Sequence, residues 1–335
     1  MGIVTWLVRR LCILPLILLG LVTLVFFLSR VVPANPARAL AGEGAGEEQV
    51  ARIIAEFNLD KPLFIQYWLF LRDLMHGNLG ISVHTWRPVV EDLRAYFPAT
   101  FELTTVAMIL AVVMGILLGI AAAVARGTFL DAFVTSFSVT GLAMPQFWLG
   151  IMLQIGIALS LKLLPLGGRI DSGISFHPIT GLCLVDALLT GNWEGLVSCL
   201  KHIVLPALTL ALTSLGLFAR ITRNTLLETL REDYIRTARA MGHSEKKVIW
   251  YGLRNALIPI VTVMGMQFAF LLGGTVVVEA VFDWPGLGLY AATAALTMDY
   301  PAIIGVTLTF GVIRMVFNLL VDLSYFAIDP RIRQG

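Results

Sequence analysis

The sequence predicts an all-α membrane protein with six transmembrane helices. First, 58% of the 335 residues are hydrophobic and only 14% are charged, whereas soluble domains are about a quarter charged. Second, six apolar runs have about the 20 residues that cross a bilayer. Third, none of them alternates like a lipid-facing strand, so helices must satisfy the backbone hydrogen bonds inside lipid. The predicted spans are residues 11–28, 101–124, 133–159, 203–221, 257–280 and 302–325.

Residues 1–28 are predicted to form an N-terminal cytoplasmic end and the first span. The stretch VRRLCILPLILLG also resembles a signal peptide, and PARALAG, which follows it, contains an Ala-x-Ala pattern. The apolar region of a secretory signal usually has about 7–15 residues, whereas this run has 18. We therefore expect a retained membrane anchor.

Residues 29–100 form the longest predicted non-membrane segment, and we expect a small external, periplasmic subdomain there. Val50, Ile53, Ile54 and Phe57 recur at the spacing of one amphipathic helical face. NLDKP ends that helix, and the aromatic-rich stretch LFIQYWLFLRDLM follows it. A mobile linker is the alternative, but the aromatic content argues against disorder.

Two spans contain residues that affect helix shape and packing. Pro145 lies inside the third span, where a proline kinks a helix. In the fifth span, Gly265, Ala269 and Gly273 share one stripe, and small residues let membrane helices approach closely. The stripe predicts a packing seam. The alternative is that Gly273 and Gly274 let the helix flex during transport.

The sixth span holds Arg314 near its middle, about 18 Å from either end at the rise of a helix. A charge at that depth costs roughly 2.5–3.5 kcal/mol, so its side chain should face protein or water. Asn318 and Asp322 follow one and two turns later on the same face. Two interpretations remain open: a structural arginine bonded to carbonyls or to a partner subunit, and an arginine that lines a translocation path.

Positive charge predicts the orientation in the membrane. If the N-terminus is cytoplasmic, thirteen Lys and Arg residues lie on the cytoplasmic side, most of them between residues 220 and 254. The two shorter external loops, about 160–202 and 281–300, hold only Lys162, Arg169 and Lys201. Because positive loops stay inside, both termini should face the cytoplasm.

The sequence lacks the patterns of catalytic and metal sites. No lysine follows a glycine, as a phosphate-binding loop requires, and neither HExxH nor GxSxG occurs. No cysteine or histidine spacing suggests a metal site. We expect no covalent chemistry, and no cofactor, metal or nucleic acid bound by this chain.

The cysteines leave one structural question open. Cys12 lies in the first span, whereas Cys183 and Cys199 lie in the second external loop, where disulfides persist. These two can form a disulfide. Alternatively, LVSCLKH buries Cys199 against apolar neighbours.

Charge is concentrated in DYIRTARAMGHSEKKVIWYGLRN, residues 233–255, where seven of 23 residues are charged. Its first part has helical spacing, and Gly242 then supplies a natural left-handed helix terminator. Ser244 follows as an N-cap with Glu245 in the first turn of a second helix. A rigid elbow of this kind, between two spans, can pass force from a soluble partner into the membrane helices.

This block resembles the EAA loop of permeases from ATP-binding cassette (ABC) importers, specifically the dipeptide, oligopeptide and nickel branch. Arg236-Thr237-Ala238 stands where other permeases have Glu-Ala-Ala, and VPANP departs from the usual Pro-Gly-Asp-Pro. The resemblance covers nearly the whole chain, in order. Its other matching stretches are RVVPANPARAL (30–40), LMHGNLGIS (74–82), FPATFELT (97–104), MPQFWLGI (144–151), HIVLPALTLAL (202–212), VVVEAVFDWPGLG (276–288) and NLLVDLSYFAIDPRIR (318–333).

The resemblance implies the type I ABC importer permease fold in a bacterial inner membrane. The permease core would be residues 101–326, with a cytoplasmic coupling loop at 222–256 and a cytoplasmic tail at 327–335. The implied partners are a second homologous permease, forming a heterodimer, an external substrate-binding protein and two cytoplasmic ATPases that use ATP and Mg. The implied ATPase-coupling residues are Tyr234, Arg236, Thr237, Ala238, Arg239, Gly242, Glu245 and Lys246. The candidates for the translocation path are Pro145, Gln267, Gly273, Gly274, Arg314 and Asn318.

Two other classes of protein fit the sequence less well. An ion-driven secondary transporter usually has midplane carboxylates or half-helices and inverted repeats, whereas this chain has one midplane charge and no clear repeat. A membrane-embedded enzyme would need paired catalytic groups. The substrate stays open, because peptides are the majority cargo of the resembled branch but nickel chelates, glutathione, opines and some sugars use the same type of permease.

Overall fold

The computed structural model describes residues 3–30, 37–38, 44, 46–56, 59–174 and 178–328. Within these ranges the regular structure is helical apart from one isolated bridge, so the all-α class is confirmed. The main helices are α1 (Ile3–Arg30), α3 (Glu47–Glu56), α4 (Leu63–Met75), α5 (Val89–Val124), α6 (Phe129–Ala143), α7 (Gln146–Leu153), the π-helix η1 (Gln154–Ser160), α8 (Cys183–Leu189), α9 (Trp193–Thr229), α10 (Asp233–Ala240), α11 (Glu245–Gly274), α12 (Val276–Val281), α13 (Leu287–Leu296) and α14 (Tyr300–Ile328).

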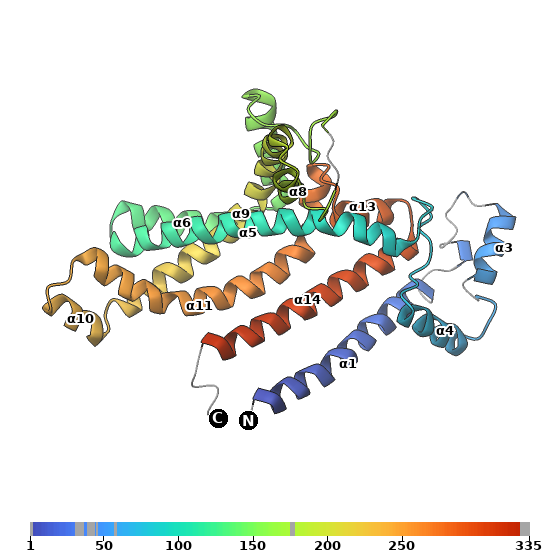
Figure 1. Cartoon of the computed structure of the whole chain (residues 1–335), viewed down its shortest axis with the longest axis horizontal. Coiled ribbons are helices and arrows are strands. Elements are labelled where there is room, and N and C mark those ends of the chain that lie inside the picture. The colour runs from blue at the N-terminus through green and yellow to red at the C-terminus, as the bar shows by residue number, and fades with distance from the viewer. Residues whose placement is uncertain are drawn as a thin grey trace.

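The two longest helices, α5 and α9, pack against each other at the centre of the molecule (Figure 1). They approach most closely at two glycines of α5. A Cβ atom on Gly115 would lie 2.5 Å from Cβ of Phe218, and one on Gly119 would lie 2.6 Å from Cβ of Thr222. Real Cβ atoms do not come this close, so the glycines set the distance between the two helices.

The other long helices flank this pair. α6 lies on α9, α11 lies against α9 and α14, and α1 packs against α14. The N-terminal end of α1 and the C-terminal end of α14 both point away from α3 and α4, toward the side that carries α10 (Figure 1). The predicted tail, 327–335, falls almost wholly outside the described residues.

By length and composition, three helices can cross a membrane: α5, α9 and the segment Tyr300–Leu320 of α14. Two bent pairs raise the number to five if each pair is one span. An apolar segment of α1, Cys12–Leu28, is shorter than these. The structure therefore agrees with a multi-pass protein, and the count of six stays a prediction.

The two bends lie at prolines. The third predicted span is broken rather than kinked, because α6 ends at Ala143, α7 begins after Pro145, and the two directions differ by 109°. In α11 the segments before and after Ile258 differ by 47°, and Pro259 begins the second. Both prolines remove a backbone donor inside an apolar helix, which explains the position of each bend.

The predicted helix of the external segment is present as α3, although Phe57 lies outside the described residues. The aromatic-rich stretch that follows forms a second helix, α4. Phe70 and Leu74 of α4 pack into a cluster formed by α1 and α14. The Gln66 amide donates to the carbonyls of Leu59 and Lys61, which fixes the turn before α4. α5 starts 12 residues before the predicted second span, because the helix continues through a stretch that carries Glu91, Asp92 and Arg94 and lies outside the apolar run.

Candidate functional site

The elbow between α9 and α11 has the predicted geometry. α10 ends just before Gly242, whose φ is +78°. The Gly242 amide donates to the Arg239 carbonyl and the His243 amide to the Ala238 carbonyl, the two bonds that close a helix through a left-handed residue. Ser244 occupies the N-cap position of α11, although its hydroxyl makes no capping bond. Helix, glycine elbow and helix are confirmed.

The elbow is packed firmly onto the helices that lead into it. Ile235 and Val248 are fully buried and form a cluster with Ala238 against Leu230, at the end of α9. Nearby, Gly252 of α11 lies against Leu230 as well. A displacement of α10 must therefore move α9 and α11, because interiors this dense do not deform freely.

The remaining coupling candidates lie mostly on the surface of the elbow. Arg239 makes a bidentate ion pair with Glu245 across the turn, with an Nε–Oε1 distance of 3.0 Å. The Tyr234 hydroxyl accepts a 2.7 Å bond from Asn255. The exposed residues are Tyr234, Arg236, Thr237, Arg239, Gly242, Glu245 and Lys246. Ala238 is buried, so it supports the elbow from inside and is not available to a partner.

Some of the path candidates converge on the middle of α9. The amide of Gln146, the residue after Pro145, donates to the Thr213 hydroxyl, and the Gln267 amide donates to the neighbouring Ser214 hydroxyl at 3.0 Å. The broken third span and α11 therefore meet at one polar position on α9. Gly273 and Gly274, at the end of α11, have open space where a Cβ would lie, so Gly273 adds nothing to an intramolecular packing seam.

Arg314 and Asn318 lie elsewhere, in a groove between α1 and α14. The groove has a volume of about 360 Å³ and is otherwise apolar, with Ile17 and Leu21 of α1 among its lining residues. Both polar side chains are exposed in the isolated chain. Arg314 makes no hydrogen bond or ion pair with the described residues, and the side chain of Asp322 is not among those described. The structure thus separates these two residues from the Gln146–Gln267 position.

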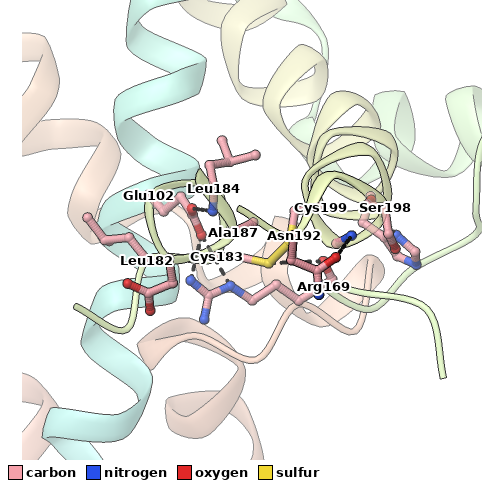
Figure 2. Close-up of a disulfide and its surroundings, with 12 residues drawn as sticks. Glu102, Arg169, Leu182, Cys183, Leu184, Ala187, Asn192, Ser198 and Cys199 are labelled. Carbon is pink, nitrogen blue, oxygen red and sulfur yellow. Dashed lines mark hydrogen bonds and ion pairs between the residues drawn. A yellow bond between two sulfur atoms is a disulfide. The ribbon is translucent and has the colours of Figure 1, made fainter. Parts of the chain in front are cut away.

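The loop between η1 and α9 is held by a disulfide and by a cluster of buried polar contacts beside it. A disulfide joins Cys183 at the start of α8 to Cys199 in α9, with a Cα–Cα distance of 6.2 Å (Figure 2). This resolves the question left open by the sequence. The bond closes a 16-residue separation, which typically stabilises the folded state by about 3 kcal/mol.

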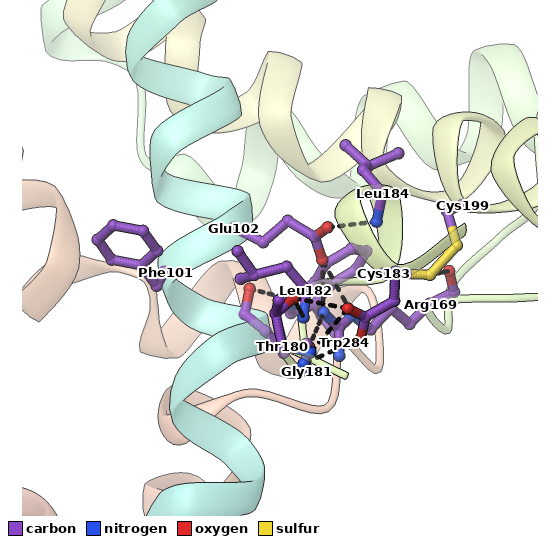
Figure 3. Close-up of polar contacts among 12 residues, drawn as sticks. Phe101, Glu102, Arg169, Thr180, Gly181, Leu182, Cys183, Leu184, Cys199 and Trp284 are labelled. Carbon is purple, nitrogen blue, oxygen red and sulfur yellow. Dashed lines mark hydrogen bonds and ion pairs between the residues drawn. A yellow bond between two sulfur atoms is a disulfide. The ribbon is translucent and has the colours of Figure 1, made fainter. Parts of the chain in front are cut away.

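Beside the disulfide, Arg169 reaches from the loop to Glu102 of α5 (Figure 3). Its Nη2 donates to Glu102 Oε2 at 2.5 Å and to the Gly181 carbonyl at 2.7 Å, and its guanidinium lies 5.8 Å from the ring centroid of Trp284. The other Glu102 oxygen accepts from the Leu184 amide. This largely buried pair joins the loop, α5 and the stretch before α13. A carboxylate at the end of a predicted span was the sequence signal for it.

Asp186 of α8 organises the same loop. It accepts hydrogen bonds from the Thr180 hydroxyl and from the backbone amides of Thr180 and Gly181. Burial acts to raise the pKa of Asp186, but these donors outweigh it and hold the pKa below its ordinary value. Because its pKa is lowered, the ionised Asp186 carboxylate stabilises the folded loop at pH values above the ordinary pKa of an aspartate. This stabilisation is lost as the pH falls through the lowered pKa of the folded state.

Another buried carboxylate explains the motif VVVEAVFDWPGLG. Glu279 of α12 is fully buried and accepts from the Thr100 hydroxyl and from the backbone amides of Gly288 and Leu289. Gly286 and Gly288 lie directly against its carboxylate. The motif is therefore a structural joint between α5, α12 and α13. Among the described residues, no group of three or more His, Cys, Asp or Glu side chains could hold a metal ion.

Two family models match the chain. The model described as binding-protein-dependent transport system inner membrane component matches residues 115–334, and a companion model for the N-terminal part of such membrane components matches residues 3–104. The chain belongs to this family. Membership confirms the resemblance expected from the charged block and the other motifs.

Full-length relatives agree with the family assignment. The chain is 44% identical to the probable D,D-dipeptide transport system permease protein of Escherichia coli K12, over 96% of this chain and 95% of that one. It is 39% identical to the dipeptide transport system permease protein of the same organism, over 98% of both chains. It is 38% identical to the glutathione transport system permease protein of Salmonella typhimurium LT2, over 97% of both.

As a member of this family, the chain is a multi-pass inner-membrane permease of an ATP-driven importer, and it is a transport component rather than an enzyme. The comparisons do not support the ion-driven alternative.

The Glu102–Arg169 pair generates a stability prediction. Arg169→Met leaves the Glu102 carboxylate buried without its counter-charge, which should lower the free energy of unfolding by about 3–5 kcal/mol. The double variant Glu102→Met/Arg169→Met should lose less than the single variant, because it buries no unpaired charge. Thermal unfolding of the purified protein in detergent measures both. Equal melting temperatures for Arg169→Met and the unsubstituted protein would show that the pair does not stabilise the folded state.

Proposed function

We propose that this permease forms half of a translocation pathway for peptides, which an external binding protein delivers. A second homologous permease completes the pathway, and two cytoplasmic ATPases drive it with ATP and Mg. The observation that carries the proposal is the rigid charged elbow in a chain whose full-length relatives are named for dipeptide, D,D-dipeptide and glutathione transport. All three names denote peptide cargo, which favours peptides over nickel chelates, opines and sugars.

In this proposal the elbow is the coupling element. The ATPases bind the exposed surface around Arg236 and Lys246, and their closure displaces α10. Because Ile235 and Val248 are buried against the end of α9, the displacement passes into α9 and α11. These helices carry Ser214 and Gln267, which meet at the proposed path. Two discrete packings of these helices would give inward-open and outward-open states.

The proposed topology has six spans, with both termini and the elbow in the cytoplasm. The segment 29–100 and the disulfide-bonded loop then lie outside, and α1 and the bent pairs count as spans. The disulfide supports this orientation, because disulfides persist in a periplasm and are rare in a cytosol.

Gly242 provides the test of coupling. Valine at a φ of +78° should cost about 1–2 kcal/mol and misalign α10 with α11. We expect Gly242→Val to assemble with its ATPases and to retain their basal hydrolysis, but to lose most uptake of a radiolabelled dipeptide in proteoliposomes. The stimulation of hydrolysis by the loaded binding protein should fall with it.

Gly127 offers a matched control for this experiment. It has the same φ of +78° and the same open space at its Cβ position, in the turn between α5 and α6. Gly127→Val therefore imposes a similar backbone strain outside the elbow, and it should keep uptake. Equal uptake by the two variants would remove the coupling role from the elbow.

Arg314 is proposed to contact the second permease. Its groove lies between α1 and α14 and away from the Gln146–Gln267 position, and an exposed arginine at mid-membrane requires polar partners that the described residues do not provide. Carbonyl or carboxylate oxygens of the partner permease would meet this need. This favours the structural interpretation over a residue that lines the path.

Substitution of Arg314 distinguishes the two interpretations. Arg314→Gln should reduce the amount of second permease that co-purifies with the chain, whereas Arg314→Lys, which keeps the charge, should retain more of it. Co-purification from solubilised membranes gives the readout. If Arg314→Gln assembles normally but transports poorly, the arginine lines the path and the interface proposal is wrong.

A further inference from the structure

α4 lies across the outer end of α1 rather than extending beyond it (Figure 1). The Tyr67 hydroxyl hydrogen-bonds to the Thr23 hydroxyl at 2.6 Å. The rings of Tyr67 and Phe70 lie 5.1 and 5.6 Å from the ring of Phe26. These contacts place one side of α4 against the last two turns of the first apolar helix.

The contacts also fix the depth of α4. The apolar run of α1 continues to Leu28, and Phe27 and Leu28 are exposed on its surface. Thr23 precedes Leu28 by five residues, so the Tyr67 hydroxyl lies about 7.5 Å inside the end of the apolar run at the rise of a helix. Helices that lie on a membrane bury their apolar face about 5–10 Å deep. α4 is therefore at the depth of the membrane interface.

The free side of α4 has the composition expected at that depth. Phe64, Trp68, Arg72 and Met75 follow one another at helical spacing, and we call them the outer stripe. All four are exposed, Phe64 at 80% and Trp68 at 63%. Tryptophan with other apolar side chains and a single arginine is typical of the layer between hydrocarbon and headgroups. A surface bathed only by water would not favour a phenylalanine and a tryptophan at this exposure.

We propose that α4 lies in the outer interfacial layer of the bilayer, with its outer stripe in contact with lipid. Phe64, Trp68 and Met75 enter the acyl-chain boundary, and Arg72 stays at the level of the phosphates. The opposite side of α4 holds Thr23 and Phe26 of α1. In this arrangement α4 anchors α1 at the membrane interface and fixes its depth and tilt in the bilayer. α14 packs against α1.

Spin labels test this placement without reliance on transport. The full-length chain, purified with the subunits that accompany it, is reconstituted into phosphatidylcholine/phosphatidylglycerol vesicles. Single nitroxide labels are attached at Phe64→Cys or Trp68→Cys in a Cys12→Ser background, which removes the free cysteine and leaves the Cys183–Cys199 disulfide in place. Glu48→Cys in the exposed first turn of α3 is the aqueous control.

Collision rates with oxygen, which enters lipid, and with a water-soluble nickel chelate are then compared at each label. We expect labels at positions 64 and 68 to collide more often with oxygen, and the label at position 48 to collide more often with the chelate. The ratio of the oxygen to the chelate collision rate should therefore differ several-fold between the two sets of labels. Both labelled positions are exposed, so the substitutions remove little packing. Chelate-dominated collisions at 64 and 68 would overturn the proposal in favour of a water-exposed helix. Protection from both reagents would also overturn it, because another protein would then cover the outer stripe.

Discussion

The close packing of α5 against α9 at Gly115 and Gly119 is the contact on which the other helices depend. With no Cβ on these residues, the two backbones approach until side chains such as Phe218 and Thr222 fill the space between them. In lipid, packing of this kind replaces the hydrophobic effect that holds helices together in water. The helices α6 and α11 pack on this pair, and its end away from the elbow receives the buried carboxylates Glu102 and Glu279.

α9 connects the disulfide-bonded loop to the elbow. It is 37 residues long, about 55 Å at the rise of a helix. Near one end Cys199 is bonded to α8, and near the other Leu226 and Leu230 support α11 and α10. Between them, Thr213 and Ser214 meet the broken third span and α11. A force on the elbow therefore reaches the proposed path through one continuous helix whose opposite end is bonded to α8.

The sequence could predict the features that depend on local chemistry. The apolar runs, a distortion of the third span at Pro145 and the left-handed Gly242 each follow from the residues at those positions, as does the helical pattern of α3. The sequence predicted a kink at Pro145 and not the complete break that the structure has. Pairings between distant residues could not be predicted in this way. Glu102 and Arg169 are 67 residues apart, and neither indicates its partner. The position of Arg314 in the α1–α14 groove, and of Ala238 inside the elbow, likewise depends on packing that a single sequence does not specify.

The central claim is that a soluble ATPase binds the elbow and moves it. Photo-crosslinking from Arg236 tests this most directly, because its side chain is 74% exposed on α10 and its only ion pair is with Asp233 one turn earlier, among the described residues. A photoreactive amino acid placed at position 236 should yield a covalent adduct with a nucleotide-binding subunit in membranes that contain the whole transporter. The account would be contradicted if the subunit co-purified with the permease and no adduct formed with it.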